Sequence, residues 1–383
     1  MKFIKKCLLW FAVIIASVVL LAYVFDVDYL LKAVRTIYVN GHTTAYLEDY
    51  KEFDNRQIEK SNIAQPWAIH KEYNKVTATP ELEKTHKEIG TVAFLIIKND
   101  SIWHESYYDG FNKDSKSNSF SMAKSVVSAS LGKAIMEGEI KSLDQLVSEF
   151  FPEFKEGKAA KMTVGDLSSM ASGLNWDESY YSPFSVTTRA YFDDDLNKVI
   201  LGLKVVEEPG KKYKYLSGNT QLLAMVIEKA TGKSLANYVS EKFWRPMGAE
   251  NEALWETDDE NGIVKAFCCI ASNARDFARF GKLYKQYGKW NGKQILDSAF
   301  IAKSITPRFT ASPQYGYGWW LSNHNGKKIF SMRGHLGQYV IVIPEDELII
   351  VRLGHEKGLQ SPKAAYSDDF FVYIDQTYKM LGK

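Results

Sequence analysis

The stretch Ser121-Met122-Ala123-Lys124 decides how this sequence is interpreted. A serine three residues ahead of a lysine shares a helix face with it, so the hydroxyl and the amine can meet. Such a pair can carry out nucleophilic chemistry without a histidine. Because Ser130 and Lys133 have the same spacing, the motif by itself does not identify the nucleophile.

The surrounding sequence favours Ser121 over Ser130. Residues 118–120 are polar and turn-like, and apolar residues recur at helical intervals only within 126–135. Ser121 is therefore predicted at a helix N-terminus, where free N–H groups and the helix dipole stabilise an oxyanion and disfavour a charged lysine. The alternative is that Ser121 only caps the helix, a contribution of about 1 kcal/mol.

Composition narrows the classes of partner and cofactor. The chain has 383 residues, 45% of them hydrophobic, which suffices for a large core and two subdomains. Its net charge is +2, and because 48 basic and 46 acidic residues are well mixed, nucleic acid is not expected as a partner. No histidine pair has metal-ligand spacing and no C-x-x-C motif occurs, so neither a metal nor another cofactor is expected. The oligomeric state is left open.

Cys268 and Cys269 are adjacent in the sequence. Neighbouring cysteines rarely bond each other without strain, so we expect two small buried residues and no disulfide framework.

The N-terminus is predicted to be a membrane anchor, residues 1–25. Three lysines within residues 2–6 precede a run without charge over residues 7–25, about long enough to cross a hydrocarbon core of ~30 Å. A cleaved signal peptide is the alternative, although the run exceeds a normal apolar region and residues 21–25 offer no small-x-small cleavage site. The lysines place the N-terminus in the cytoplasm. We therefore expect a single-pass protein of a bacterial inner membrane with its body on the extracytoplasmic side.

The remaining sequence predicts an α+β fold: an antiparallel sheet flanked by helices, interrupted by an all-helical insertion. Residues 26–85 are predicted as a stalk and wrapping segment, and 86–383 as the main domain with the insertion at roughly 135–300. Strand patterns lie at both ends of the main domain, and helical patterns lie between them. The predicted strands are 91–98, 101–108, 328–332, 338–343 and 347–353, and a last helix covers 365–380.

Two further segments complete a candidate site. A lysine at its reference pKa of ~10.4 is a poor base, but burial lowers that value, and Tyr215 could relay a proton if it gains phenolate character beside Lys124. In residues 333–338, two glycines let the backbone approach a substrate. The N–H of Gln338, after Gly337, could then hold an oxyanion together with that of Ser121. The alternatives are a core tyrosine and an ordinary glycine bend.

A loop carrying Trp176, Tyr180 and Tyr181 could overhang the cleft and close on a substrate. The alternative is that these aromatic side chains pack locally.

In their order along the chain, these motifs resemble the serine hydrolase superfamily of class C β-lactamases, penicillin-binding DD-peptidases and related esterases. The resemblance runs from roughly residue 85 to 380. It is closest to the branch of 6-aminohexanoate-dimer hydrolases and esterases. Supporting motifs are Leu143-Asp144, Phe151-Pro152, Thr163-Val164-Gly165-Asp166-Leu167, Ser172-Gly173-Leu174-Asn175-Trp176-Asp177-Glu178, Pro209-Gly210, Gly232-Lys233-Ser234-Leu235, Trp244-Arg245-Pro246-Met247-Gly248, Ala274-Arg275-Asp276-Phe277-Ala278-Arg279-Phe280-Gly281 and Arg333-Gly334-His335-Leu336-Gly337-Gln338.

The resemblance implies a role for each matched residue. Ser121 matches the acylated nucleophile, Lys124 its base and Tyr215 the proton shuttle of the Y-x-N motif. Ser217 stands where that motif often has asparagine, as a substrate-binding residue. Residues 335–337 match the K-T-G triad of β-lactamases.

The triad departs from the β-lactamase pattern because His335 and Leu336 replace a permanent cation and a hydroxyl. A β-lactam carboxylate would lose both partners, which favours an ester or amide substrate. Arg333, on the same strand face, could restore a charge. A β-lactamase or DD-peptidase-type enzyme, and a non-catalytic penicillin-sensing or cell-wall-binding domain, remain the alternatives to an ester- or amide-cleaving serine hydrolase.

Overall fold

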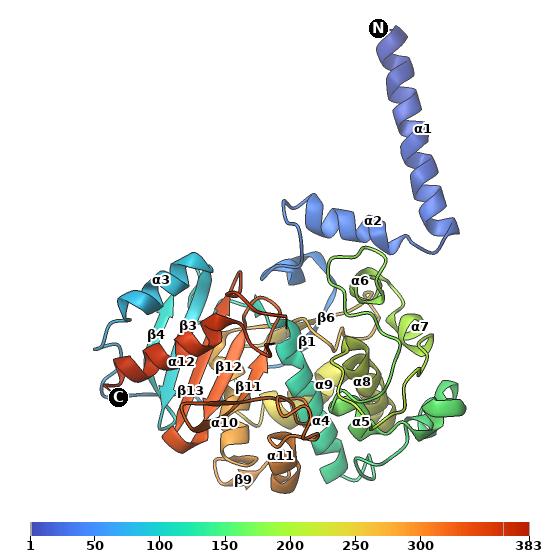
Figure 1. Ribbon diagram of the computed structural model, residues 1–383. Helices are drawn as coiled ribbons and strands as arrows, with labels where there is room; N and C mark the ends of the chain where they lie inside the picture. The colour runs from blue at the N-terminus through green and yellow to red at the C-terminus, as the bar shows by residue number, and fades with distance from the viewer. Residues whose placement is uncertain (1, 363, 383) are drawn as a thin grey trace.

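The computed structural model describes residues 2–362 and 364–382 (Figure 1). Its largest element is a seven-stranded sheet in the order β10-β11-β12-β13-β3-β4-β2, antiparallel except for the parallel pair β2 and β4. The strands are β2 (Ala68–Ile69), β3 (Thr91–Lys98), β4 (Ser101–Tyr107), β10 (Trp320–His324), β11 (Lys327–Arg333), β12 (Tyr339–Ile343) and β13 (Leu348–Gly354). The predicted antiparallel sheet with helices on its faces is confirmed.

Both faces of this sheet are buried. Residues that alternate along β12 point to opposite faces, so Ile341 packs with α3 (Pro80–Glu88) and α12 (Asp368–Met380), whereas Val342 packs with α10 (Ala274–Lys285) (Figure 1). Gly281 of α10 lies so close to β12 that a Cβ there would come within 2.9 Å of Val340. The missing side chain therefore lets α10 lie directly on the sheet.

A second, four-stranded sheet in the order β1-β6-β7-β5 lies beside the helices that carry the active-site motifs. Its strands are β1 (Asn55–Ile58), β5 (Ser117–Asn118), β6 (Ala253–Glu256) and β7 (Ile270–Ser272). The helices are α4 (Ala123–Met136), α5 (Val164–Ser168), α6 (Val186–Phe192), α7 (Leu196–Leu201), α8 (Ser217–Thr231), α9 (Leu235–Val239) and α11 (Ser298–Ser304).

The expected insertion at 135–300 is wrong in two respects. It contains β6, β7 and the short hairpin β8 (Lys289–Trp290) and β9 (Lys293–Gln294), so it is not all helical. It also contains α10, which packs on the seven-stranded sheet. Helical periodicity alone could not tell which layer a helix joins.

The N-terminal segment begins with α1 (Lys2–Val24), which projects from the body and buries only Ala22 (Figure 1). With a mean hydropathy of 2.7 over its most apolar window, α1 is long and apolar enough to cross a membrane, a test that a signal sequence also passes. After α1 come α2 (Tyr29–Ala33) and a π-helical turn, η1 (Val34–Tyr38). The expected stalk at 26–85 also supplies β1, β2 and α3 to the body.

Short helical turns connect these elements. They are η2 (Asp49–Glu52), η3 (Phe120–Met122), η4 (Val147–Glu149), η5 (Pro152–Phe154), η6 (Gly157–Lys161), η7 (Ser240–Trp244) and η8 (Pro344–Asp346).

Candidate active site

Ser121 lies in the turn η3, directly before α4, and the structure brings it together with Lys124. The Lys124 Nζ donates hydrogen bonds to the Ser121 Oγ at 2.9 Å and to the Phe267 carbonyl at 2.7 Å. Only 3% of Lys124 is exposed, whereas Ser121 is half-buried. The hydroxyl can therefore face a substrate while the amine lies behind it.

The second motif with the same spacing is inaccessible. Ser130 is fully buried in the middle of α4, and its hydroxyl donates to the Val126 carbonyl at 3.0 Å. Lys133 instead forms an ion pair with Glu137 at 3.5 Å. The contacts of both residues lie along α4, so this pair stabilises the helix and does not face a cleft.

Burial changes the acid–base character of Lys124. It lowers the pKa of the ammonium to about 8, and the nearby Glu178 carboxylate opposes this shift. A large share of the amine is therefore neutral at mildly alkaline pH, which a general base requires.

Tyr215 is the second polar neighbour of the pair. Its ring centroid lies 5.1 Å from the Lys124 Nζ, and it lines the same cavity as Ser121. Burial, reinforced by Glu178, raises the pKa of this phenol far above its usual value. The expected phenolate character is therefore disfavoured, and a neutral phenol that donates a proton fits the site better than a free phenolate.

Glu178 organises the opposite side of the site. Its carboxylate accepts hydrogen bonds from the Ser217 N–H and the Ser217 hydroxyl, each at 2.6 Å, and from the Tyr180 hydroxyl at 2.5 Å. Glu178 belongs to one of the matched motifs, but no role at the site was predicted for it. The available signal was an acidic residue within an aromatic loop, and its partner Ser217 lies 39 residues further along the chain.

Gly334 and His335, which directly follow β11, line the same cavity as Ser121. His335 borders Ser121 in the cleft, and its ring lies between those of Phe120 at 6.2 Å and Tyr180 at 4.6 Å. Burial, helped by the positive charges of Lys357 and Arg333, lowers the pKa of His335 to about 4. The imidazole is therefore neutral at physiological pH.

The structure does not place Gly337 and Gln338 among the residues that line the two cavities at Ser121. Gln338 is fully buried, and its side chain accepts from the Leu336 N–H and donates to the Gly354 carbonyl. Gly337 has φ +80°, and its carbonyl accepts a hydrogen bond from Arg352. Both residues shape the turn after β11 and do not line the cleft at Ser121, because the chain reaches the cleft three residues earlier than expected.

Trp176 also differs from the expectation of a side chain over the cleft. It is only 3% exposed, and its ring packs against Gly218, where a Cβ would come within 2.5 Å. Trp176 therefore supports the start of α8, whereas Tyr180 lines the cleft and is 39% exposed.

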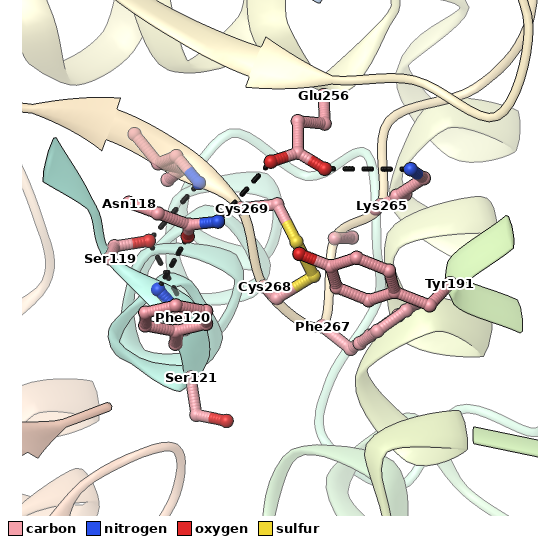
Figure 2. Close-up of a disulfide and its surroundings, with 12 residues drawn as sticks. Asn118, Ser119, Phe120, Ser121, Tyr191, Glu256, Lys265, Phe267, Cys268 and Cys269 are labelled. Carbon is pink, nitrogen blue, oxygen red and sulfur yellow. Dashed lines mark hydrogen bonds and ion pairs between the residues drawn. A yellow bond between two sulfur atoms is a disulfide. The ribbon is translucent and has the colours of Figure 1, made fainter. Parts of the chain in front are cut away.

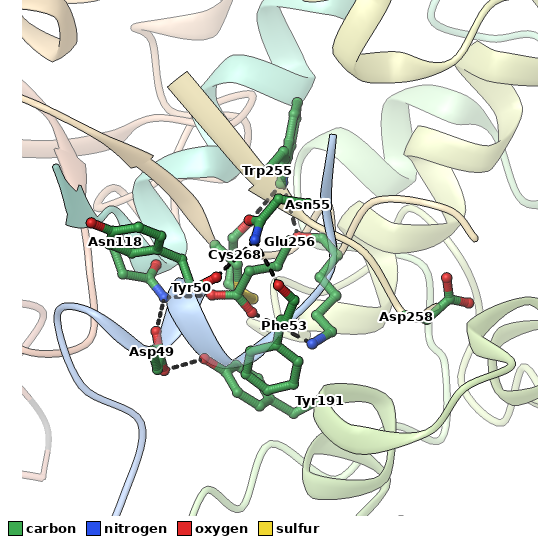
Figure 3. Close-up of polar contacts among 12 residues, drawn as sticks. Asp49, Tyr50, Phe53, Asn55, Asn118, Tyr191, Trp255, Glu256, Asp258 and Cys268 are labelled. Carbon is green, nitrogen blue, oxygen red and sulfur yellow. Dashed lines mark hydrogen bonds and ion pairs between the residues drawn. A yellow bond between two sulfur atoms is a disulfide. The ribbon is translucent and has the colours of Figure 1, made fainter. Parts of the chain in front are cut away.

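Asn118 fixes the turn that carries Ser121. Its side-chain oxygen accepts from the Phe120 N–H at 2.8 Å, and its amide nitrogen donates to Asp49 and Glu256 (Figure 3). The Asp49 carboxylate also accepts from the Tyr191 hydroxyl at 2.8 Å. Because Asp49 and Glu256 belong to distant segments, this buried network joins the N-terminal segment to the nucleophile turn.

A disulfide joins Cys268 and Cys269, so the expectation of two unbonded cysteines is wrong (Figure 2). The bond follows Phe267, whose carbonyl accepts from Lys124. Cys269 has φ +77°, a conformation that a sequence pattern does not reveal.

Two cavities meet at Ser121, Tyr180 and His335. One has a volume of about 450 Å³ and the other about 630 Å³. Within residues 2–362 and 364–382, no group of three or more histidine, cysteine, aspartate or glutamate side chains is placed to hold a metal ion.

Known proteins share this architecture. The beta-lactamase family model matches residues 79–369. The 6-aminohexanoate-dimer hydrolase of Paenarthrobacter ureafaciens is 26% identical over 315 residues, which make up 74% of this chain and 80% of that protein.

Solved structures extend the comparison. A Bacillus anthracis protein provisionally identified as a 6-aminohexanoate-dimer hydrolase has a TM-score of 0.70 and 23% identity, covering 86% of this chain and 91% of its own. A penicillin-binding protein from Bacillus halodurans has a TM-score of 0.62 and 14% identity, covering 78% of this chain and 99% of its own. At these identities the two likenesses establish the fold alone.

Proposed function

Because this chain belongs to the beta-lactamase family, we propose that it is a serine hydrolase that cleaves an ester or amide through an acyl-enzyme on Ser121. The hydrogen bond between the Lys124 Nζ and the Ser121 Oγ carries this proposal, since it joins a nucleophile to a base of lowered pKa. The family resemblance and the similarity to a 6-aminohexanoate-dimer hydrolase support it.

In the proposed acylation, the neutral Lys124 amine takes the Ser121 proton as the Oγ attacks the substrate carbonyl carbon. Tyr215 then donates its proton to the leaving oxygen or nitrogen as that bond breaks, and Lys124 returns the proton to the phenol. Water attacks the acyl-enzyme in the reverse sequence and releases the acid.

The oxyanion that forms on the carbonyl needs two hydrogen-bond donors. The Ser121 N–H lies in the turn η3, directly before α4, where the helix dipole also favours negative charge. We assign the second donor to the His335 N–H, because His335 borders Ser121 in both cavities and Gln338 does not.

Ester or amide substrates fit this site better than β-lactams. The neutral His335 offers no permanent cation to a β-lactam carboxylate. The guanidinium of Arg333, which lines the larger cavity together with Lys357, donates hydrogen bonds to the Ala365 carbonyl and the Gln360 side chain. Two of its five N–H donors are therefore engaged by the protein itself.

The purified full-length protein should hydrolyse p-nitrophenyl acetate clearly and penicillins and cephalosporins poorly. Parallel assays of p-nitrophenol release and of β-lactam absorbance test this preference. Efficient β-lactam turnover with negligible esterase activity would contradict the assignment and point to Arg333 as the missing cation. Failure to turn over either substrate, or to be acylated, would favour the non-catalytic alternative.

We further propose that α1 remains attached and anchors the enzyme in a bacterial inner membrane, with the body on the extracytoplasmic side. The length and hydropathy of α1, and the lysines that precede its apolar run, support this. In cells the full chain should stay in the membrane fraction after a carbonate wash. Recovery of a shortened soluble form would instead identify a cleaved signal peptide.

A further inference from the structure

The two cavities that meet at Ser121 differ in chemistry. Among the described residues that line the 450 Å³ cavity there is no aspartate, glutamate, lysine or arginine. The 630 Å³ cavity, in contrast, is lined by Glu178, Arg333 and Lys357. The nucleophile therefore lies at the junction of an apolar chamber and a charged one.

We propose that the apolar chamber binds the acyl chain of an amphipathic ester or amide, a medium-length or longer lipid-like chain, while the polar leaving group occupies the charged chamber. This inference rests on the proposed function, because it assigns the two halves of the substrate to the two sides of Ser121. The chamber volume of about 450 Å³ falls within the range of about 300–1,000 Å³ that is usual for small-molecule sites.

One wall of the apolar chamber comes from the segment directly after α1. Leu30 and Ala33 of α2 and Ile37 of η1 line it together with Phe192 and Phe267 of the main body. This wall lies outside residues 79–369, the part matched by the family model. The matched part of the family model therefore does not include this wall.

This wall is fixed to the body by polar contacts. The Tyr29 hydroxyl donates to the Pro183 carbonyl at 3.0 Å, and Arg189 of α6 forms an ion pair with Asp26 at 2.6 Å. The segment between α1 and η1 therefore closes the chamber as a held element of the fold.

The chamber is bordered by apolar side chains that remain exposed to solvent. Val34, Tyr38, Tyr181 and Phe184 all line it, and they are 50%, 64%, 79% and 75% exposed. Clustered exposed apolar residues mark a surface that receives an apolar partner. Because α2 begins only a few residues after the apolar helix α1, this border lies on the side of the molecule from which a membrane-embedded chain would enter.

Chain-length selectivity tests the inference. The full-length protein in lipid nanodiscs, which avoid competition from detergent, is assayed with p-nitrophenyl acetate, butyrate and octanoate. We expect kcat/KM to rise by about tenfold or more from acetate to octanoate, since each buried methylene strengthens binding.

Ala33→Trp should fill the chamber and lower the ratio of octanoate to acetate kcat/KM about tenfold. Thr44→Trp should fill the chamber from the loop after η1 and give the same loss, so a folding defect in one of the two variants does not decide the result. Val39→Trp is the matched control, because Val39 is 74% exposed and does not line the chamber. Its ratio should equal that of the unchanged protein.

The outcomes separate this inference from the proposed function. An unchanged protein that hydrolyses acetate but shows no gain with octanoate overturns the chamber assignment alone. So does an unaltered ratio in both blocking variants while thermal unfolding shows that they are folded. Absence of acetate turnover in the unchanged protein overturns the proposed function itself.

Discussion

Ser121→Ala is expected to abolish hydrolysis of p-nitrophenyl acetate while leaving the melting temperature within a few degrees. The substitution removes the nucleophile, and Ser130, the other serine with the motif spacing, cannot replace it because it is fully buried in α4. The free energy of unfolding should change little, since the Ser121 side chain is only half-buried and is not part of the hydrophobic core. Initial rates and thermal unfolding measure the two effects.

Ser130→Ala is the matched control for this prediction. Ser130 belongs to the same motif pattern, but its hydroxyl only donates to the Val126 carbonyl within the helix. Its loss should leave turnover unchanged. Substantial residual turnover in Ser121→Ala, or an equal loss in Ser130→Ala with Ser121 intact, would mean that the other pair carries the chemistry.

Lys124→Met is expected to lower kcat by roughly 10²–10⁴-fold, the usual range for a general base. Methionine has a similar length and no charge, so it can fill the buried space that the lysine side chain leaves.

Tyr215→Phe, which keeps the ring and removes only the proton donor, should lower kcat by about 100-fold.

The pH dependence distinguishes a base from a packing residue. Below its pKa of about 8 the Lys124 amine is protonated and cannot accept the serine proton, so the rate should rise with pH through about 8 and then level off. Tyr215→Phe should keep this rise, and Lys124→Met should lose it. A Lys124→Met enzyme with an unchanged pH profile would remove Lys124 from the role of base.

Local patterns in the sequence predicted the parts of the fold that depend on local geometry. The strand expected at 91–98 is β3 without a shift, because residues 92–97 form a continuous apolar run bounded by Gly90 and the turn at 99–100. Ser121 and Lys124 could be paired in advance since a spacing of three residues places two side chains on one helix face.

Contacts between residues far apart in the chain could not be predicted from local sequence patterns. Strands β1 and β6 pair Asn55 with Glu256, and each has only four residues, too few for a periodic signal. The contact between Glu178 and Ser217, like the wall that α2 adds to the apolar chamber, depends on how distant segments meet. The two residues of the Cys268–Cys269 disulfide were expected to stay unbonded because adjacency usually strains such a bond.

The expected position of the oxyanion donor failed for a different reason. The two glycines of residues 333–338 led us to expect the donor N–H at Gln338, but β11 ends at Arg333, and Gly334 and His335 in the following turn line the cavity at Ser121. A shift of three residues in a turn changes which N–H faces the cleft. The residue types alone do not determine where in the segment that turn falls.

Covalent labelling of the full-length protein with a fluorophosphonate, followed by peptide mass spectrometry, tests the acyl-enzyme on Ser121 most directly. We expect one adduct per chain, on the peptide that contains Ser121, which forms faster above pH 8 than below it and is absent from Ser121→Ala. An adduct on another residue, or no adduct from a protein that still hydrolyses p-nitrophenyl acetate, would contradict it.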